Sequence, residues 1–408
     1  MSRRSPSLWF ALFVVFIDAL GMGIILPIMP DLLTGLTGRT VAGTAFIGGV
    51  MAAVYAMNQF LVGPVMGALS DQFGRRPLIL FCLATLTIDY ILMALAWNVW
   101  ILFLGRFLAG LAGASYSVAT AYITDVSPRD QRSQNFGLIS AAFGIGFIVG
   151  PLIGGLAGAV DVRAPFWLAA GLSGFGTLVG FIILPESLMP ENVRKFSWAN
   201  SNPFASLMRA FKLPGLGMFL LGFFVLTVGG MAYPVIWAYW GKETFGWSPQ
   251  MIGASLAAYG VGLAIVQGGL IRLIIPWLGE HRSILIGYWL AALTAFMFAF
   301  ATETWMVFVI IPIAVFANVA DAALTGAMTR EVSDNEQGEL QGVLGSIIAV
   351  CSVLSPIVMT AIFFRAADPK NTIYFPGAPF FIVGVLTVIA ILPLRRALAN
   401  QRAADRHA

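Results

Sequence analysis

Charged residues are scarce in this chain of 408 residues, which also has only two cysteines and two histidines. Asp, Glu, Lys and Arg make up 10% of the sequence, against about 25% in soluble domains. With 59% hydrophobic residues, the composition excludes an ordinary soluble protein. Cys82 and Cys351 lie far apart in apolar segments, so we expect no disulfide framework, and no Cys/His spacing indicates a metal site.

Motifs of soluble enzymes are missing as well. The sequence contains no Gly-x-x-x-x-Gly-Lys-Ser/Thr phosphate loop, and its glycine pairs lie inside apolar runs with no strand before them. We therefore expect a protein that is not an enzyme and that holds no cofactor.

Twelve apolar segments of about 19–26 residues fill most of the chain. They cover residues 8–30, 43–66, 78–96, 99–121, 134–158, 164–184, 215–240, 250–271, 283–301, 304–327, 339–364 and 378–397. A run of this length crosses a hydrocarbon core of roughly 30 Å as a helix, because lipid offers no hydrogen-bond partners for open backbone. The fold class predicted is an all-α integral membrane protein with twelve transmembrane helices in the lipid bilayer.

The cations are distributed unequally between the two sides of this predicted membrane protein. With a cytoplasmic N-terminus, 17 of the 23 Lys and Arg residues fall on the cytoplasmic side, 5 fall outside and Arg106 lies within a span. Because cytoplasmic loops are enriched in cations, we predict a multi-pass protein of the cell (inner) membrane with both termini in the cytoplasm. The first apolar run is too long for a signal peptide. The cations follow topology, so no nucleic-acid partner is expected.

The chain divides into two halves that echo each other. A polar segment at 185–214 is predicted to be a cytoplasmic linker between six-helix bundles at 1–184 and 215–408. Three residue pairs repeat at a displacement of 205, namely Gly74 with Gly279, Gly137 with Gly342, and Pro151 with Pro356. A weak internal repeat is typical of secondary transporters, which bind substrate between their halves.

The segment from Gly67 to Pro77, here called the charged turn, lies between the second and third apolar runs. It holds Asp71, Arg75 and Arg76 in an otherwise almost uncharged region. Such a turn at a membrane surface indicates ionic contacts that form and break, as a gate requires.

The repeat of the charged turn in the second half is degenerate. The displacement of 205 puts Pro276 at the place of Asp71 and Glu280 at the place of Arg75. We therefore expect the full charged gate only in the first half.

These residues resemble the signatures of the major facilitator superfamily. Its signature between the second and third helices is a Gly, an Asp four residues on, and then Gly-Arg-Arg, here Gly67, Asp71, Gly74, Arg75 and Arg76. A second signature, Gly-x-x-x-Gly-Pro-x-x-Gly-Gly in the fifth helix, is matched by residues 146–155 with Gly150 and Pro151. This second motif is associated with antiporters.

The resemblance extends over nearly the whole chain to the tetracycline/proton antiporters and related drug exporters. It is carried by residues 18–30, 105–110, 121–125, 278–282 and 338–342. It implies export of a small amphipathic compound, antibiotic or drug-like, by alternating access, with protons as the coupling ion. We expect a monomer to be the functional unit. Two positions depart from the family: Leu263 and Ala291 stand where tetracycline exporters carry a His and an Asp.

Four ionisable side chains lie well inside the predicted spans: Asp18, Asp89, Arg106 and Asp321. Such groups are rare in membranes and mark function by default. Asp89 and Arg106 lie at the same depth, roughly 10 Å below the outer face at 1.5 Å per residue, so we expect them to interact. We assign all four to proton coupling; the alternatives are a static ion pair for Asp89 and Arg106, a structural hydrogen bond for Asp18, and a local cap or pair for Asp321.

The gate and the substrate site have further candidates. By resemblance, Asp71 faces the N-terminus of the eleventh helix near Gly338 and Arg75 bonds Asp125, which latches the outward-facing state; simple loop anchoring is the alternative. The predicted gate comprises Gly67, Asp71, Gly74, Arg75, Arg76, Asp125, Gly150 and Pro151. The predicted substrate contacts are Asn58, Gln59, Tyr233, Trp237, Gln267 and Asn318, although the aromatic residues could equally pack or face lipid.

The sequence thus predicts a proton-coupled efflux antiporter. A dedicated exporter of an endogenous metabolite or siderophore-like compound stays open as an alternative, as does a receptor or scaffold that has lost transport. Costly charges inside the spans argue against a scaffold.

Overall fold

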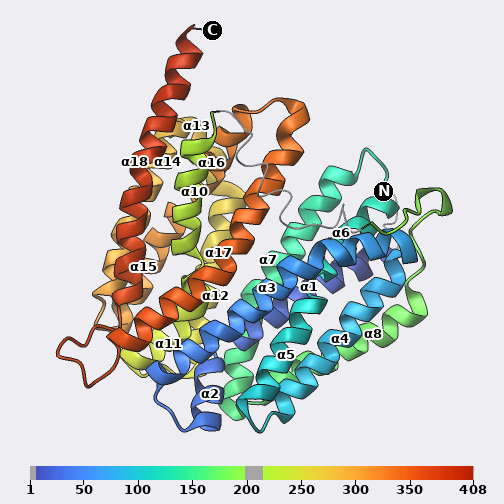
Figure 1. Cartoon of the computed structure of the whole chain (residues 1–408), viewed down its shortest axis with the longest axis horizontal. Coiled ribbons are helices and arrows are strands. Elements are labelled where there is room, and N and C mark those ends of the chain that lie inside the picture. Colours follow the sequence, from blue (N-terminus) through green and yellow to red (C-terminus); the bar gives the residue numbers. More distant parts are fainter. Residues whose placement is uncertain (1–5, 198–214, 408) are drawn as a thin grey trace. The chain divides into compact units, whose positions relative to one another are not determined.

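The structure is a computed structural model that describes residues 6–197 and 215–407. In these ranges every regular element is helical, and twelve helical stretches are long and apolar enough to cross a membrane (Figure 1). The predicted all-α fold with twelve transmembrane helices is therefore confirmed. Residues 198–214 of the predicted linker lie outside the described residues.

The helices of the first half are α1 (Pro6–Ile25), α2 (Met29–Thr37), α3 (Val41–Phe73), α4 (Arg75–Leu95), α5 (Val99–Ala112), α6 (Ser115–Val126), α7 (Arg132–Val160) and α8 (Ala164–Ile183). Those of the second half are α10 (Gly217–Gly230), α11 (Tyr233–Phe245), α12 (Pro249–Ile265), α13 (Ile271–Leu278), α14 (Glu280–Ala299), α15 (Thr304–Ala317), α16 (Val319–Arg330), α17 (Gln337–Ala366) and α18 (Ala378–His407). Short turns of 3-10 helix at Pro190–Asn192 and Asp334–Glu336 and a π turn at Val266–Leu270 complete the regular structure.

The chain forms two compact units. The first consists of Met1–Thr44, Val50–Pro203 and Trp247–Ala257, and the second of Ala45–Gly49, Phe204–Gly246 and Ala258–Ala408. The units thus follow the two halves of the sequence apart from two short segments, one from α3 and one that contains the start of α12.

Helices α1 and α7 of the first unit pack closely along a row of glycines. A Cβ atom at Gly146 would lie 2.6 Å from the carbonyl oxygen of Phe16, and one at Gly150 would lie 2.6 Å from that of Leu20. Small residues let helix backbones approach in a membrane. The glycines of the second signature therefore serve helix packing.

The second unit has a corresponding seam between α10 and α17, with larger residues. At the displacement of 205, Cys351 replaces Gly146 and Ser355 replaces Gly150. The Ser355 hydroxyl donates a hydrogen bond of 2.6 Å to the carbonyl oxygen of Val228. One seam thus rests on close backbone approach and the other on a side-chain hydrogen bond.

Two spans are broken at equivalent places in the two halves. The span Val99–Val126 breaks between α5 and α6 at Gly113, and the span Thr304–Arg330 breaks between α15 and α16 at Asn318, which is 205 residues further on. Polar side chains bind the backbone at both breaks. Gln59 donates to the carbonyl oxygen of Gly113 at 3.1 Å, and the Asn318 amide donates to that of Ala314 at 3.0 Å. These bonds satisfy carbonyls that a broken helix leaves open.

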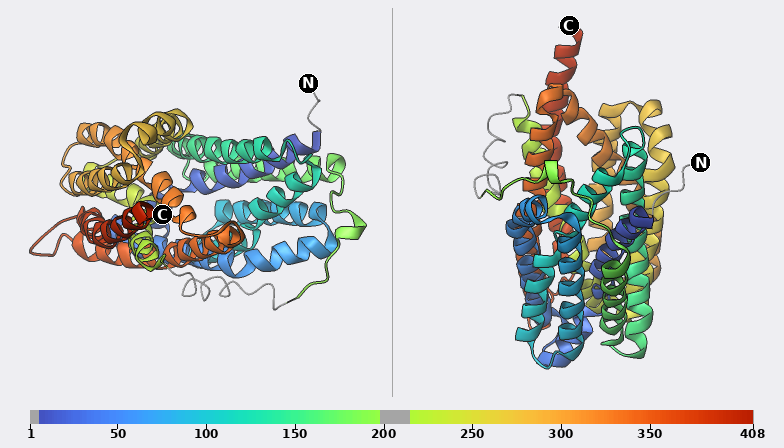
Figure 2. Two further views of the ribbon diagram at one scale, coloured as in Figure 1. Left: turned by 90° about the horizontal axis from the view of Figure 1, so that it is seen from above. Right: turned by 90° about the vertical axis from the view of Figure 1, so that its right-hand side faces the viewer.

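The core of the second unit forms where α10, α14, α16, α17 and α18 meet. It includes Phe219, Ile284, Ala323, Leu340 and Leu394, each almost fully buried. Helix α18 packs against α10 and α14 and continues past the ends of its neighbours toward the C-terminus (Figure 2).

Candidate functional site

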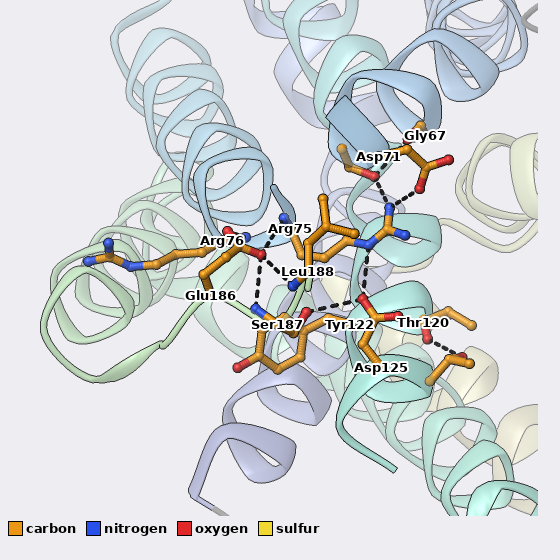
Figure 3. A network of polar contacts seen from close by, with 12 residues as sticks. Gly67, Asp71, Arg75, Arg76, Thr120, Tyr122, Asp125, Glu186, Ser187 and Leu188 are labelled. Atoms are coloured by element: carbon orange, nitrogen blue, oxygen red, sulfur yellow. Dashed lines mark hydrogen bonds and ion pairs between the residues drawn. The ribbon is translucent and has the colours of Figure 1, made fainter. Parts of the chain in front are cut away.

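Arg75 is the centre of an ionic network at the charged turn. Its Nη1 lies 2.6 Å from Oδ1 of Asp71 at the end of α3, and its Nε lies 3.2 Å from Oδ2 of Asp125 at the end of α6 (Figure 3). Nη1 also donates to the Ser70 hydroxyl at 2.5 Å. The network ties the ends of α3, α4 and α6 together. The predicted contact of Arg75 with Asp125 is therefore present, and Asp71 is a second partner of Arg75 that the sequence did not predict.

Glu186 completes this network, a contribution that the sequence interpretation missed because it placed Glu186 only in the linker. The Glu186 carboxylate accepts hydrogen bonds from the N–H groups of Arg75 at 2.9 Å and Arg76 at 3.1 Å (Figure 3). It also accepts from the N–H groups of Ser187 and Leu188, both at 2.9 Å. The first amides of a helix lack intrahelical partners and carry a partial positive charge. Glu186 therefore caps α4 from a distant part of the chain.

Gly74 makes this cap possible. Its φ of +104° lies in a region that side chains disfavour. A Cβ atom at this position would also run into the Glu186 carboxylate. Gly74 is thus required for two reasons: the turn needs its positive φ, and the Glu186 carboxylate leaves no room for a side chain.

Arg76 and Gly67 have other roles than Arg75. The Arg76 side chain points away from the ionic network and donates to the carbonyl oxygen of Phe181 at 2.7 Å, with its guanidinium 5.6 Å from the centre of the Phe181 ring (Figure 3). It thereby joins α4 to α8. Gly67 accepts a hydrogen bond of 2.8 Å from the Ser70 hydroxyl through its carbonyl oxygen. Within the described part of the chain, no atom lies within 4 Å of the place of its Cβ.

The second half has an ion pair at the positions equivalent to Arg75 and Asp125, with the signs exchanged. The displacement of 205 relates Arg75 to Glu280 and Asp125 to Arg330, and Arg330 Nη2 forms an ion pair with Glu280 Oε2. Helix α14 also starts directly after a glycine with positive φ, Gly279. The second half therefore has a counterpart of the Arg75–Asp125 pair but none of Asp71, whose place is taken by Pro276.

The N-terminus of α17 is the predicted partner of Asp71. Helix α17 begins at Gln337, one residue before Gly338. The hydroxyl and N–H of Ser333 donate to Glu336 at 2.8 and 3.1 Å and hold the pKa of that carboxyl below its ordinary value. The contact between Asp71 and this helix end stays a prediction.

Asp89 and Arg106 form an ion pair inside the first unit. Arg106 Nη2 lies 2.8 Å from Asp89 Oδ2, and Asp89 is fully buried while Arg106 is 9% exposed. The predicted pairing is therefore confirmed. Gly105 leaves room for the acid, because a Cβ there would lie 2.6 Å from Asp89 Oδ1. Among the described residues, that oxygen has no hydrogen-bond partner.

Asp18 belongs to the same buried region. It lies on α1, is 3% exposed, and has Ser115 at the start of α6 as a polar neighbour. Tyr55 and Tyr90 lie close enough to Asp18, Asp89 and Arg106 to interact electrostatically with all three. We call Asp18, Tyr55, Asp89, Tyr90 and Arg106 the buried charge cluster. Four spans contribute to it, and Oδ2 of Asp18 has no hydrogen-bond partner in the described part of the chain.

Asp321 has a different setting in the second unit. It lies in the first turn of α16, just after the break at Asn318, and is exposed. Its Oδ1 accepts a hydrogen bond of 2.9 Å from the hydroxyl of Tyr288 on α14. Of the alternatives for Asp321, the structure shows a local pair, in which the partner is the neutral hydroxyl of Tyr288.

Three predicted substrate residues make contacts within their own unit. Asn58, which is buried, donates to the carbonyl oxygen of Phe107 at 3.4 Å, and Gln59 bonds the break at Gly113. Asn318 donates to the Tyr259 hydroxyl at 3.0 Å. These residues join adjacent spans, and their contact with substrate stays a prediction.

The other three candidates differ in accessibility. Trp237 is 5% exposed and packs edge to face on Phe298 and Phe380 at centroid distances of 5.2 and 6.1 Å. Tyr233 packs on the same two rings. Gln267 is exposed in the π turn of its span. The two aromatic residues therefore pack against other rings, which is one of the two alternatives for them. A substrate role for all three residues stays a prediction.

Twelve membrane spans, buried charges inside them and a charged turn between two of them are typical of a membrane transporter. The profile of the Major Facilitator Superfamily matches residues 11–356 and 218–407. The chain belongs to this superfamily, and it is a multi-pass membrane transporter, not an enzyme.

Proteins similar in sequence include drug-resistance proteins. The class C tetracycline resistance protein of Escherichia coli is 37% identical over 98% of this chain and 99% of its own length. The class B protein of Escherichia coli is 33% identical over 92% of this chain and 93% of its own length. The predicted resemblance to these exporters is confirmed.

Solved structures share the fold at low identity. A nucleoside transporter, NupG, superposes with a TM-score of 0.76 over 97% of this chain and 99% of its own, at 13% identity. The human organic anion transporter MFSD10 gives a TM-score of 0.69 over 96% of this chain and 100% of its own, at 20% identity.

Proposed function

We propose that the protein exports a small amphipathic, drug-like compound across the inner membrane in exchange for protons, by alternating access. Protons are the coupling ion, no cofactor is required, and a monomer is the working unit. Full-length similarity to tetracycline resistance proteins supports drug efflux. The observation that carries proton coupling is the buried charge cluster.

The ion pair of this cluster links a proton to a rearrangement. Asp89 and Arg106 neutralise each other at 2.8 Å in a region with almost no exposure. A proton on Asp89 removes the negative charge and leaves Arg106 without its counter-ion, which is unfavourable in a buried site. Asp18, with an oxygen free of hydrogen bonds in the described chain, is the adjacent acid that can take or pass on the proton.

The network around Arg75 supplies the gate in this proposal. It joins the ends of three helices through two carboxylates, and Glu186 adds a third at the start of α4. Its ionic contacts stabilise one conformation and must open in the other. Several charged hydrogen bonds of this kind bias a near-balanced equilibrium strongly, because each contributes roughly 1.5–3 kcal/mol.

The transported compound is amphipathic and antibiotic-like in this proposal, and tetracycline is one candidate. The relatives' names favour tetracycline, whereas Leu263 and Ala291 replace the ionisable residues that tetracycline exporters resembling this chain carry. A rearranged substrate site is therefore expected.

Drug uptake into everted membrane vesicles tests this function. A pH gradient, acid inside, is imposed in the absence of ATP, and accumulation of tetracycline and a panel of amphipathic drugs is measured. We expect the wild type to accumulate at least one compound and Asp89→Asn to accumulate none, while Asp161→Asn, which alters an exposed acid between α7 and α8, behaves as wild type. Folded, inserted wild-type protein that accumulates no compound would contradict drug export.

A further inference from the structure

Helices α14 and α18 of the second unit pack side by side and run in opposite directions (Figure 1). A Cβ atom at Gly384 would lie 2.8 Å from the Phe296 ring, which fixes the register of the two helices. At 1.5 Å per residue, Arg282 lies about 21 Å from Phe296 toward the start of α14, and Arg395 lies about 17 Å from Gly384 toward the end of α18. The two arginines therefore lie within about one helical turn of the same depth.

Each of these helices carries a stripe of exposed apolar side chains that ends in an arginine. The stripe of α14 consists of Ile286, Trp289 and Leu293, and that of α18 consists of Val385, Ile389 and Leu392. Arg282 precedes the first stripe by about one turn, and Arg395 follows the second by about one turn. Both arginines are exposed. Exposed apolar stripes on membrane spans face lipid tails, and arginines near the ends of spans reach the headgroup level.

The arginines of α18 differ in the side of the helix on which they lie. Arg395 and Arg402 follow Gly384 by about three and about five helical turns. They therefore lie on the edge of α18 that faces α14, because Gly384 is in contact with α14. Arg396 is equally exposed but lies about 100° further round the helix, away from this edge. We call Arg282, Arg395 and Arg402, together with the two apolar stripes, the α14–α18 seam.

The positive charge of this seam is not compensated within the described part of the chain. The acid nearest to Arg282 in the sequence, Glu280, forms an ion pair with Arg330. No carboxylate of the described residues forms an ion pair with Arg282, Arg395 or Arg402. An anion from outside the chain can therefore bind here without displacing an internal partner.

The first unit has no charge at the equivalent positions. The displacement of 205 relates Arg282, Arg395 and Arg402 to Pro77, Pro190 and Ser197. Helix α8 ends at Ile183, and the chain then turns so that Glu186 caps α4. The arginines of the α14–α18 seam are thus a particular feature of the second unit and not one that the two halves share.

We propose that the α14–α18 seam binds one anionic phospholipid, with its phosphate at Arg282, Arg395 and Arg402 and its acyl chains along the two apolar stripes. The headgroup supplies the negative charge that the arginines lack, as in basic sites between spans that bind anionic lipids. A lipid fits better than a soluble phosphate because the arginines continue stripes that face the bilayer. The site is independent of the transported compound.

Lipid binding to the purified, delipidated full-length protein in nonionic detergent tests the site. Native mass spectrometry follows titrations with dioleoylphosphatidylglycerol and with the zwitterionic dioleoylphosphatidylcholine. We expect the wild type to bind the anionic lipid at least about tenfold more tightly than the zwitterionic one. Arg282→Gln and Arg395→Gln should each weaken binding of the anionic lipid about fivefold. Arg396→Gln is the matched control, since it removes the same charge at nearly the same depth, and it should stay within about twofold of wild type.

Three outcomes would overturn the site. Equal binding of the two lipids by the wild type would show no preference for an anionic headgroup. Equal weakening by Arg395→Gln and Arg396→Gln would show a general attraction of the surface charge without a seam. Displacement of the lipid by an equal concentration of glycerophosphoglycerol, the same headgroup without acyl chains, would point to a soluble phosphate. Should Arg395→Gln fail to fold, Arg282→Gln on the other helix decides the question against the same control.

Discussion

Two acids inside the spans, one from each unit, have opposite settings. In the first unit Asp89 is fully buried and paired with Arg106 at 2.8 Å, whereas in the second Asp321 is exposed and bonded to the neutral Tyr288. The buried pair takes up a proton only when its partners separate, whereas Asp321 has, among the described residues, no cation from which to separate. In the proposed function, the pair in the first unit is therefore the one whose protonation requires a rearrangement.

The largest expected effect follows from breaking the buried pair. Arg106→Ala leaves Asp89 charged and unpaired, which costs about 3–5 kcal/mol and abolishes uptake. Thermal unfolding in detergent and vesicle uptake measure the two effects. The double variant Asp89→Asn/Arg106→Gln should recover much of the stability without recovering uptake. Full uptake by the double variant would show that the pair is only structural.

The helix seams provide the next comparison between the units. Gly150→Ala places a methyl group against the backbone of α1, and overpacking of this kind costs typically 1–3 kcal/mol. Ser355→Ala, at the equivalent position, loses one hydrogen bond and should cost about 1 kcal/mol. Denaturant or thermal unfolding measures both changes in the free energy of unfolding.

Gly144 on the same helix is the control for the glycine seam. Within the described residues no atom lies within 4 Å of the place of its Cβ. Gly144→Ala should therefore be neutral or stabilising by up to about 1 kcal/mol, since Ala favours a helix over Gly. Equal destabilisation by both substitutions would refute the close-approach argument.

A smaller effect is expected at the cap of α4. Glu186→Gln keeps the shape of the side chain but removes the charge at the helix N-terminus, which contributes roughly 0.3–1 kcal/mol and up to about 2 kcal/mol when partly buried. We expect a modest loss of stability and a change in the rate of uptake. Glu191→Gln, an exposed acid further along the same segment, should change neither.

The smallest effect on stability is expected for the charge-reversed pair in the second unit. Arg330 is exposed, and exposed pairs contribute about 0–1 kcal/mol. Glu280→Arg or Arg330→Glu alone should slow uptake by placing like charges together, and the double exchange should restore it. Unchanged uptake in both single variants would show that only the pair in the first unit works as a gate.

Much of this arrangement could be predicted from the sequence. Apolar run length gave the twelve spans, and equal depth in adjacent spans gave the pairing of Asp89 with Arg106. The roles of Glu186 and Tyr288 could not be predicted, because each depends on the approach of a distant segment to a helix end or to an acid. The role of Arg330 can be predicted, because the displacement of 205 relates Arg330 to Asp125 and Glu280 to Arg75.

Proton movement driven by the drug itself tests the central claim most directly. Everted vesicles containing a pH-sensitive dye are energised, and each compound found to be transported is then added to wild type, Asp89→Asn and Asp18→Asn. The account predicts that addition of drug releases protons from wild-type vesicles and that both variants lose this release. Drug uptake by wild type with no movement of protons would contradict it.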